Sequence, residues 1–87
     1  MEYVIVAYRS RTHTVRFHEY LDRVGIPNEI VNTPKEAGVG CGLSVKVPFA
    51  KLNLVKRAVA FSNLNSFAGF FLVKHIAKKK TVRALFN

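Results

Sequence analysis

The architecture of this chain depends first on the run Tyr3-Val4-Ile5-Val6-Ala7-Tyr8. Its residues are β-branched, aromatic or small, and polar residues bound the run on both sides. A short continuous apolar run of this kind is typical of a strand that is buried on both faces. We therefore expect residues 3–8 to form a central strand of a sheet.

The next segment, residues 11–24, has the periodicity of a helix. Phe17, Leu21 and Val24 follow one another at spacings of four and three residues, which places them on one helical face. Ser10 precedes the segment, where its side chain can accept a hydrogen bond from a free amide of the first turn, and Gly25 is suited to end the helix. A second strand is expected at residues 29–32.

The second half of the chain repeats this order of elements. Residues 43–47 alternate apolar with polar side chains, Pro48 stops that strand and begins a helix that fades near residue 61, and residues 67–73 are an apolar strand-like run. The resulting order β-α-β-β-α-β predicts an α+β fold, the ferredoxin-like sandwich. In that fold, two helices cover one face of a four-stranded antiparallel sheet.

The length of 87 residues predicts one domain, which we place at residues 1–75 and follow with a basic tail at residues 76–87. In the tail, apolar residues alternate with basic ones at roughly helical spacing; they are Ile76, Val82, Leu85 and Phe86. This pattern predicts either a loose tail or a short additional amphipathic helix.

The composition restricts the classes of function. A formal charge of +9, from 14 Lys and Arg against 5 Asp and Glu, favours acidic partners, among which nucleic acid must be considered. No apolar run approaches the roughly 20 residues that span a bilayer, and the first residues lack the features of a signal peptide. These features predict a cytoplasmic protein without a membrane span.

The most informative stretch for function is residues 33–44, which contain three of the five glycines and the only cysteine. Glycine at every second position, at Gly38, Gly40 and Gly42, indicates sharp turns or a close approach to the backbone. A single cysteine forms no intramolecular disulfide, and the chain has no Cys/His cluster with metal spacing, so we expect no metal or other cofactor. Cys41 is then a free thiol suited to exchange or persulfide chemistry, the alternative being a small buried apolar side chain.

Other residues are candidates to support this thiol or to bind an anion. Consecutive amides of the loop can form a concave donor site, and the motif Arg9-Ser10-x-x-His13 lies at a strand-to-helix junction, where first-turn amides converge. A capping serine followed by solvated side chains is the alternative for that motif. The full candidate set is Arg9, Ser10, His13, Lys35, Glu36, Gly38, Gly40, Gly42 and Ser44.

Several of these motifs resemble a family of small bacterial proteins described as "putative selenium/sulfur carrier-like". The resemblance is carried by Tyr8-Arg9-Ser10, His13-Thr14, residues 32–45 and, more loosely, residues 66–69. It extends over about residues 3–73 and leaves out the basic tail. The resemblance implies the fold given above and a reactive cysteine at Cys41.

From this resemblance, our leading hypothesis is a carrier that holds a persulfide or selenopersulfide on Cys41, between sulfur or selenium donor and acceptor enzymes. Such a protein has no turnover on a small substrate. The first alternative is a non-catalytic interaction or regulatory module that binds an anion or a partner protein through the glycine-rich loop. A weaker alternative is RNA binding through the basic surface, and the sequence leaves a homodimer open.

Overall fold

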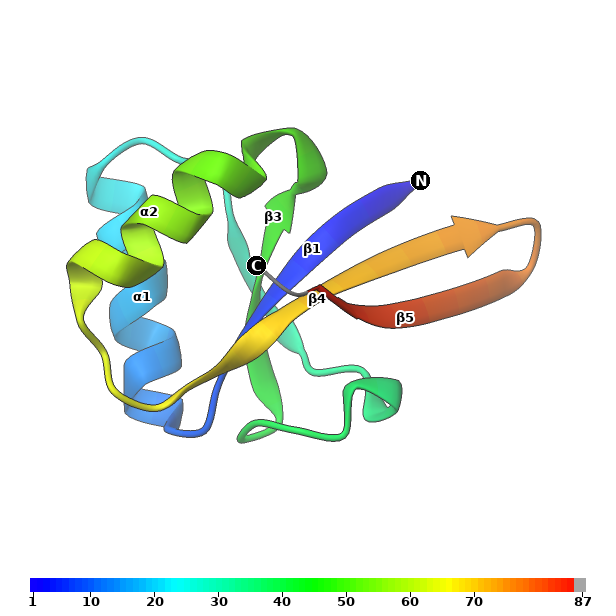
Figure 1. Ribbon diagram of the computed structural model, residues 1–87, viewed down its shortest axis with the longest axis horizontal. Coiled ribbons are helices and arrows are strands. Elements are labelled where there is room, and N and C mark those ends of the chain that lie inside the picture. Colours follow the sequence, from blue (N-terminus) through cyan, green and yellow to red (C-terminus); the bar gives the residue numbers. More distant parts are fainter. Residues whose placement is uncertain (86–87) are drawn as a thin grey trace.

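The computed structural model describes residues 1–85 and shows an antiparallel sheet with two helices on one face (Figure 1). The strands lie in the order β2-β3-β1-β4-β5, and every neighbouring pair is antiparallel. The elements are β1 (Glu2–Tyr8), α1 (Arg11–Arg23), β2 (Glu29–Asn32), η1 (Lys35–Ala37), β3 (Leu43–Pro48), η2 (Phe49–Lys51), α2 (Leu52–Ser62), β4 (Phe67–Ile76) and β5 (Lys79–Leu85), where η denotes a short 3-10 helix. The α+β class is confirmed, and the expected four strands are corrected to five.

Strand β1 is the middle strand of the sheet, as its apolar run predicts. It pairs with β3 on one side and with β4 on the other, and residues Val4 to Tyr8 are buried. Val4, Val6 and Tyr8 belong to the core under the helices, whereas Ile5 and Ala7 belong to a smaller core on the opposite face. The alternation along one strand thus separates two cores.

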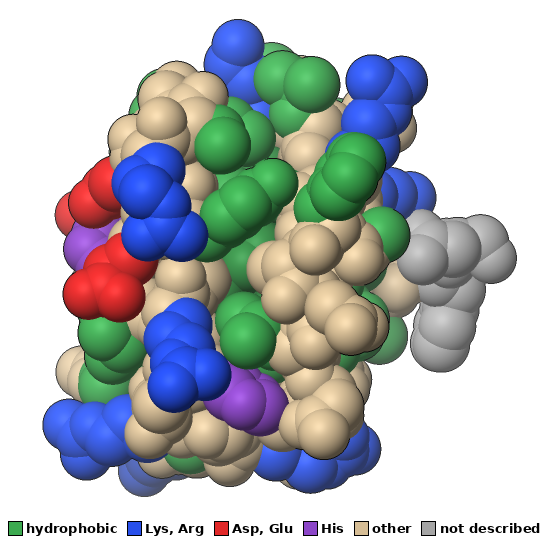
Figure 2. All heavy atoms as spheres, turned by 90° about the vertical axis from the view of Figure 1, so that its left-hand side faces the viewer, with side chains coloured by type: hydrophobic (Ala, Val, Ile, Leu, Met, Phe, Trp, Pro, Cys, Tyr) green, Lys and Arg blue, Asp and Glu red, His purple; other side chains and the backbone are tan. Residues whose placement is uncertain are grey.

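The helix layer forms where the periodicity indicates. The Ser10 side chain accepts a hydrogen bond from His13 N at 3.2 Å, which confirms the expected cap of α1, and Phe17 and Leu21 are buried under it. Figure 2 shows this layer: apolar side chains line the seam between the helices, with Lys and Arg on both flanks and acidic side chains along one edge. Within residues 1–85, no helix has the length and apolar character needed to cross a bilayer.

The face of the sheet without helices is covered in part by the glycine-rich loop. Ala37 and Val39 of this loop pack against the core formed by Ile5, Ala7, Phe71 and Val73. This part of the loop therefore lies on the opposite side of the sheet from α1 and α2 (Figure 1). The packing of these two side chains holds this part of the loop against the sheet.

The expected helix in the tail is wrong, because residues 79–85 form strand β5. This strand pairs with β4 from Ile76↔Lys79 to Phe70↔Leu85, through a turn in which Ala77 has φ +55°. Val82 packs on the face of the sheet without helices, and Leu85 packs on the face that the helices cover. A spacing of three residues, which suggests one face of a helix, places two residues on opposite faces of a strand. The same spacing therefore suits a strand with apolar neighbours on both faces. Phe86 and Asn87, the last residues of the expected tail, lie outside the described residues.

Tyr8 carries a buried hydroxyl that leads to a testable prediction. In the described part of the chain this hydroxyl has no hydrogen-bond partner, and Ser62, which lies close to it, donates its own hydrogen to Val59 O at 3.1 Å. Burial raises the pKa of Tyr8 to about 12. Because an unsatisfied buried group is costly, we expect Tyr8→Phe to raise the free energy of unfolding by about 1 kcal/mol.

Urea unfolding of the two proteins measures this change. Tyr20→Phe is the matched control, because the Tyr20 side chain is only partly buried and its hydroxyl deletion is expected to change the free energy by less than about 0.5 kcal/mol. A clear loss of stability in Tyr8→Phe would show that the hydroxyl is satisfied in solution.

Candidate functional site

Cys41 lies in the loop between β2 and β3, two residues before β3 begins. Its side chain is half-buried and is a free thiol. The Sγ atom donates to Leu43 O at 3.5 Å and lies 3.6 Å from Thr14 Oγ1. The thiol is therefore in contact with α1 as well as with its own loop.

Thr14 is the residue that brings helix α1 to the cysteine. It is fully buried in the first turns of α1, and its hydroxyl lies 3.2 Å from Ser10 O, to which it can donate. The same hydroxyl also lies 3.5 Å from Leu43 O, so one hydrogen has three acceptors within reach: Ser10 O, Leu43 O and the sulfur. Sequence reasoning did not select Thr14 as a site residue, although it belongs to the His13-Thr14 pair of the resemblance.

The glycines on either side of Cys41 have a backbone that other residues rarely adopt. Gly40 and Gly42 both have φ +94°. A Cβ atom at Gly40 would lie 3.4 Å from Tyr8 O, so the loop runs close to the end of β1, whereas a Cβ atom at Gly42 would meet nothing within 4 Å. Gly40 fits against the sheet, and Gly42 leaves the surface beside the thiol open.

Polar contacts close the base of the loop. Thr33 N donates to Gly42 O at 2.9 Å, and the Thr33 and Ser44 hydroxyls lie 2.6 Å apart, with Ser44 fully buried. At the other end, Gly38 has φ +67° and its amide donates to Lys35 O at 3.1 Å. Ser44 and Gly38 thus support the shape of the loop through these contacts.

The charged candidates of the loop point to other partners. Glu36 pairs with Lys80 of β5 at 3.6 Å, which ties η1 to the edge of the sheet. Lys46 of β3, outside the loop, pairs with Glu29 at 3.4 Å and lies 4.4 Å from the centre of the Tyr3 ring. Among residues 1–85, no hydrogen bond or ion pair joins the Lys35 side chain to Cys41.

The Arg9-Ser10-His13 motif forms a separate cluster with Ser66. His13 Nδ1 lies 2.6 Å from Ser66 Oγ, and Ser10 N donates to that same oxygen at 3.2 Å. Arg9 donates from its side chain to Phe67 O at 3.3 Å and from its amide to Ser66 O at 2.8 Å. The motif thus joins the start of α1 to the start of β4, and no hydrogen bond among the described residues links His13 to Cys41.

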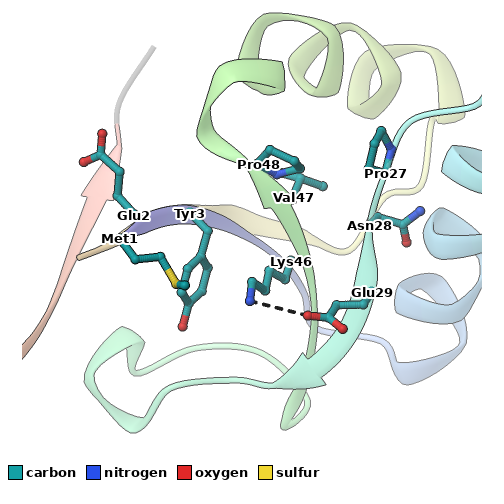
Figure 3. Close-up of a pocket in the computed structure, with 9 residues that line it drawn as sticks. All are labelled: Met1, Glu2, Tyr3, Pro27, Asn28, Glu29, Lys46, Val47 and Pro48. Carbon is teal, nitrogen blue, oxygen red and sulfur yellow. Dashed lines mark ion pairs between the residues drawn. The ribbon is translucent and has the colours of Figure 1, made fainter. Parts of the chain in front are cut away.

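Two hollows lie near these residues. One, of about 280 Å³, is bounded by the glycine-rich loop, from Thr33 to Lys35 and from Gly38 to Gly42 without Cys41. The other, of about 370 Å³, lies between the start of β1 and the edge strand β2, where Lys46 reaches toward Glu29 beside the Tyr3 ring (Figure 3). In the part of the chain that the structure describes, no group of three or more His, Cys, Asp or Glu side chains is placed to hold a metal ion.

Comparison with known proteins identifies a family that this chain matches. The family model described as "Putative Se/S carrier protein-like" matches residues 2–66, which run from β1 to the residue before β4. No curated protein and no solved structure matches the chain. The matched residues include Cys41, its glycine-rich loop and Thr14, and they exclude β4 and β5.

Proposed function

Because the chain belongs to the "Putative Se/S carrier protein-like" family, we propose that it carries sulfur or selenium on Cys41 between a donor and an acceptor enzyme. The observation that carries this proposal is the position of the thiol, which is half-exposed and held between Thr14 and Leu43 O. A carrier needs both properties, because the sulfur atom must be reached by a partner and must be presented at a defined place.

The proposed loading step is a thiol–persulfide exchange. The thiolate of Cys41 attacks the outer sulfur of a donor persulfide, the donor S–S bond breaks, and the donor leaves as a thiolate that takes up a proton. Cys41 then holds the outer sulfur as a persulfide. In delivery, an acceptor nucleophile attacks that outer sulfur and Cys41 leaves as the thiolate; selenium follows the same sequence as a selenopersulfide.

One neighbour of Cys41, the Thr14 hydroxyl, can stabilise a negative charge on sulfur during these steps. The Leu43 carbonyl accepts a hydrogen from the protonated thiol, whereas the Thr14 hydroxyl can also donate to a sulfur anion. Thr14 belongs to the first turns of α1, where the helix dipole favours negative charge. On the other side, Gly40 and Gly42 carry no side chain that would obstruct a partner.

A second candidate function is binding of an anion or a partner protein by the loop itself. The hollow of about 280 Å³ with Lys35 at its margin favours it. In this case the thiol is incidental. The two functions differ in whether Cys41 changes covalently.

The proposal extends to fold and location. We propose that β1 to β4 with α1 and α2 form a ferredoxin-like unit, since β3 lies between β1 and β2 while β1 lies between β3 and β4. Strand β5 is then an addition at the β4 edge.

A persulfide carrier also requires a reducing compartment such as the cytoplasm, where Cys41 stays a free thiol.

Cyanolysis tests whether a loaded sulfur can be passed on. After incubation with a cysteine desulfurase and L-cysteine, followed by desalting, we expect cyanide to remove the outer sulfur as thiocyanate, with about one equivalent per chain. Cyanide attacks a persulfide sulfur and leaves a thiol unchanged. Thiocyanate no higher than in a sample without desulfurase would contradict the proposal and favour the loop-binding function.

A further inference from the structure

The net positive charge of this protein comes from the second half of the chain. All five acidic residues lie within the first 36 positions, where they balance five Lys and Arg. Residues 37–87 contain the other nine Lys and Arg and no acidic residue. The net charge of +9 is therefore the charge of the second half, which includes β4 and β5.

Strands β4 and β5 form a two-stranded arm whose hairpin end extends beyond the other strands (Figure 1). Two of its five cations are paired: Lys74 with Glu2 at 3.7 Å and Lys80 with Glu36 at 3.6 Å. Lys78, Lys79 and Arg83 are exposed and have no ion pair within residues 1–85. Three cations of the arm are thus available to a partner.

The arm also presents an apolar centre. Ile76 is 67% exposed; Lys79 is its cross-strand partner, and Lys74 lies two residues before it on the same face. A hollow of about 360 Å³ runs beside it, bounded by Met1, Glu2, Lys74, His75 and Ile76. The exposed isoleucine thus offers a partner one apolar contact with cations beside it, the combination of apolar and polar contacts that protein interfaces use.

We propose that the β4–β5 arm is a docking surface for an acidic protein surface that inserts an apolar side chain beside Ile76. The partner's carboxylates pair with Lys78, Lys79 and Arg83, which steer its approach. A nucleic acid fits this surface less well, because a phosphate backbone gains nothing from an exposed isoleucine. A second copy of this chain is also disfavoured at the β5 edge, because pairing two such strands brings like charges together.

The inference does not depend on the chemistry of Cys41. The family match ends at residue 66, so the arm lies outside the part of the chain that the family model matches. The Glu36–Lys80 pair nevertheless connects it to the loop that carries the thiol. A partner docked on the arm would thus contact an element that is tied to the candidate site.

The test uses the full chain and two labelled twelve-residue peptides, one all glutamate and one with two central leucines. In fluorescence anisotropy, we expect the leucine peptide to bind at least tenfold more tightly, and Ile76→Ser to remove most of this difference. The triple variant Lys78→Gln/Lys79→Gln/Arg83→Gln is expected to weaken binding of both peptides about tenfold. The matched control Arg11→Gln/Arg16→Gln/Arg23→Gln, which removes the same charge from the exposed face of α1, should change binding less than about threefold.

Three results would overturn the proposal. The first is an equal loss of binding in the arm variant and the α1 control. That result would show that the peptides respond to the overall charge of the protein and not to the arm. The second is no preference for the leucine peptide. The third is tighter binding of an RNA or DNA duplex than of the leucine peptide at the same ionic strength, with no effect of Ile76→Ser on duplex binding. That result would assign the surface to nucleic acid.

Discussion

Cys41→Ser is expected to abolish loading of sulfur and of selenium completely, because no other side chain of this protein can form a persulfide. The serine hydroxyl can keep the contacts with Thr14 Oγ1 and Leu43 O, so the free energy of unfolding should change by less than about 1 kcal/mol. Thiocyanate release after incubation with desulfurase and L-cysteine measures the first effect, and urea unfolding measures the second.

A cysteine moved to another exposed loop is the control for the position of the thiol. The double variant Cys41→Ser/Asn65→Cys keeps one cysteine but places it at an exposed loop position before β4. We expect it to load at least tenfold more slowly than the natural chain, because it lacks the contact with Thr14 and the turns at Gly40 and Gly42. Equal loading at both positions would show that the site around Cys41 contributes nothing beyond a thiol.

The second large effect is expected at the glycines beside the thiol. In Gly40→Ala/Gly42→Ala, two residues with a Cβ atom must adopt φ +94°, and each is expected to cost about 1 to 2 kcal/mol. Their sum is a large part of the roughly 4 to 13 kcal/mol that stabilise a domain of this size. We therefore expect the urea midpoint to fall sharply and Cys41 to become more accessible to alkylation in the native state, because the loop is no longer held against Tyr8.

Gly25→Ala is the matched control for this prediction. Gly25 has φ +78° and open space around it, and it follows α1 at a distance in sequence from the loop. It should cost about 1 to 2 kcal/mol as well, but leave the alkylation rate of Cys41 unchanged. If both variants change alkylation equally, the effect is a general loss of stability and the glycines have no specific role at the thiol.

Much of the scaffold could be predicted because its signals are local. The apolar run of β1, the cap at Ser10 and the stop at Pro48 each depend on neighbouring residues, and each is found where expected. Strand β5 could not be predicted in this way. Its Val82 and Leu85 have a spacing that suits a helix, and only the unpaired edge of β4 makes the strand favourable.

The backbone around Cys41 could be predicted from the sequence, but the partners of the candidate side chains could not. Glycines on both sides of a single cysteine indicate a special backbone, and Gly40 and Gly42 have it. The contact between Thr14 and Cys41 depends on how α1 packs beside β3, which no short motif encodes. The same holds for His13, whose ring pairs with Ser66, and for Glu36, whose partner Lys80 lies on the strand that was missed.

The central claim is that Cys41 takes up one chalcogen atom in the folded protein. The most direct measurement is the intact mass of the native chain after incubation with a cysteine desulfurase and L-cysteine, followed by peptide mapping. The proposal predicts one added sulfur atom per chain, located on Cys41 and removed by a thiol reductant. An unchanged mass, together with a Cys41 that resists alkylation until the protein is unfolded, would contradict it.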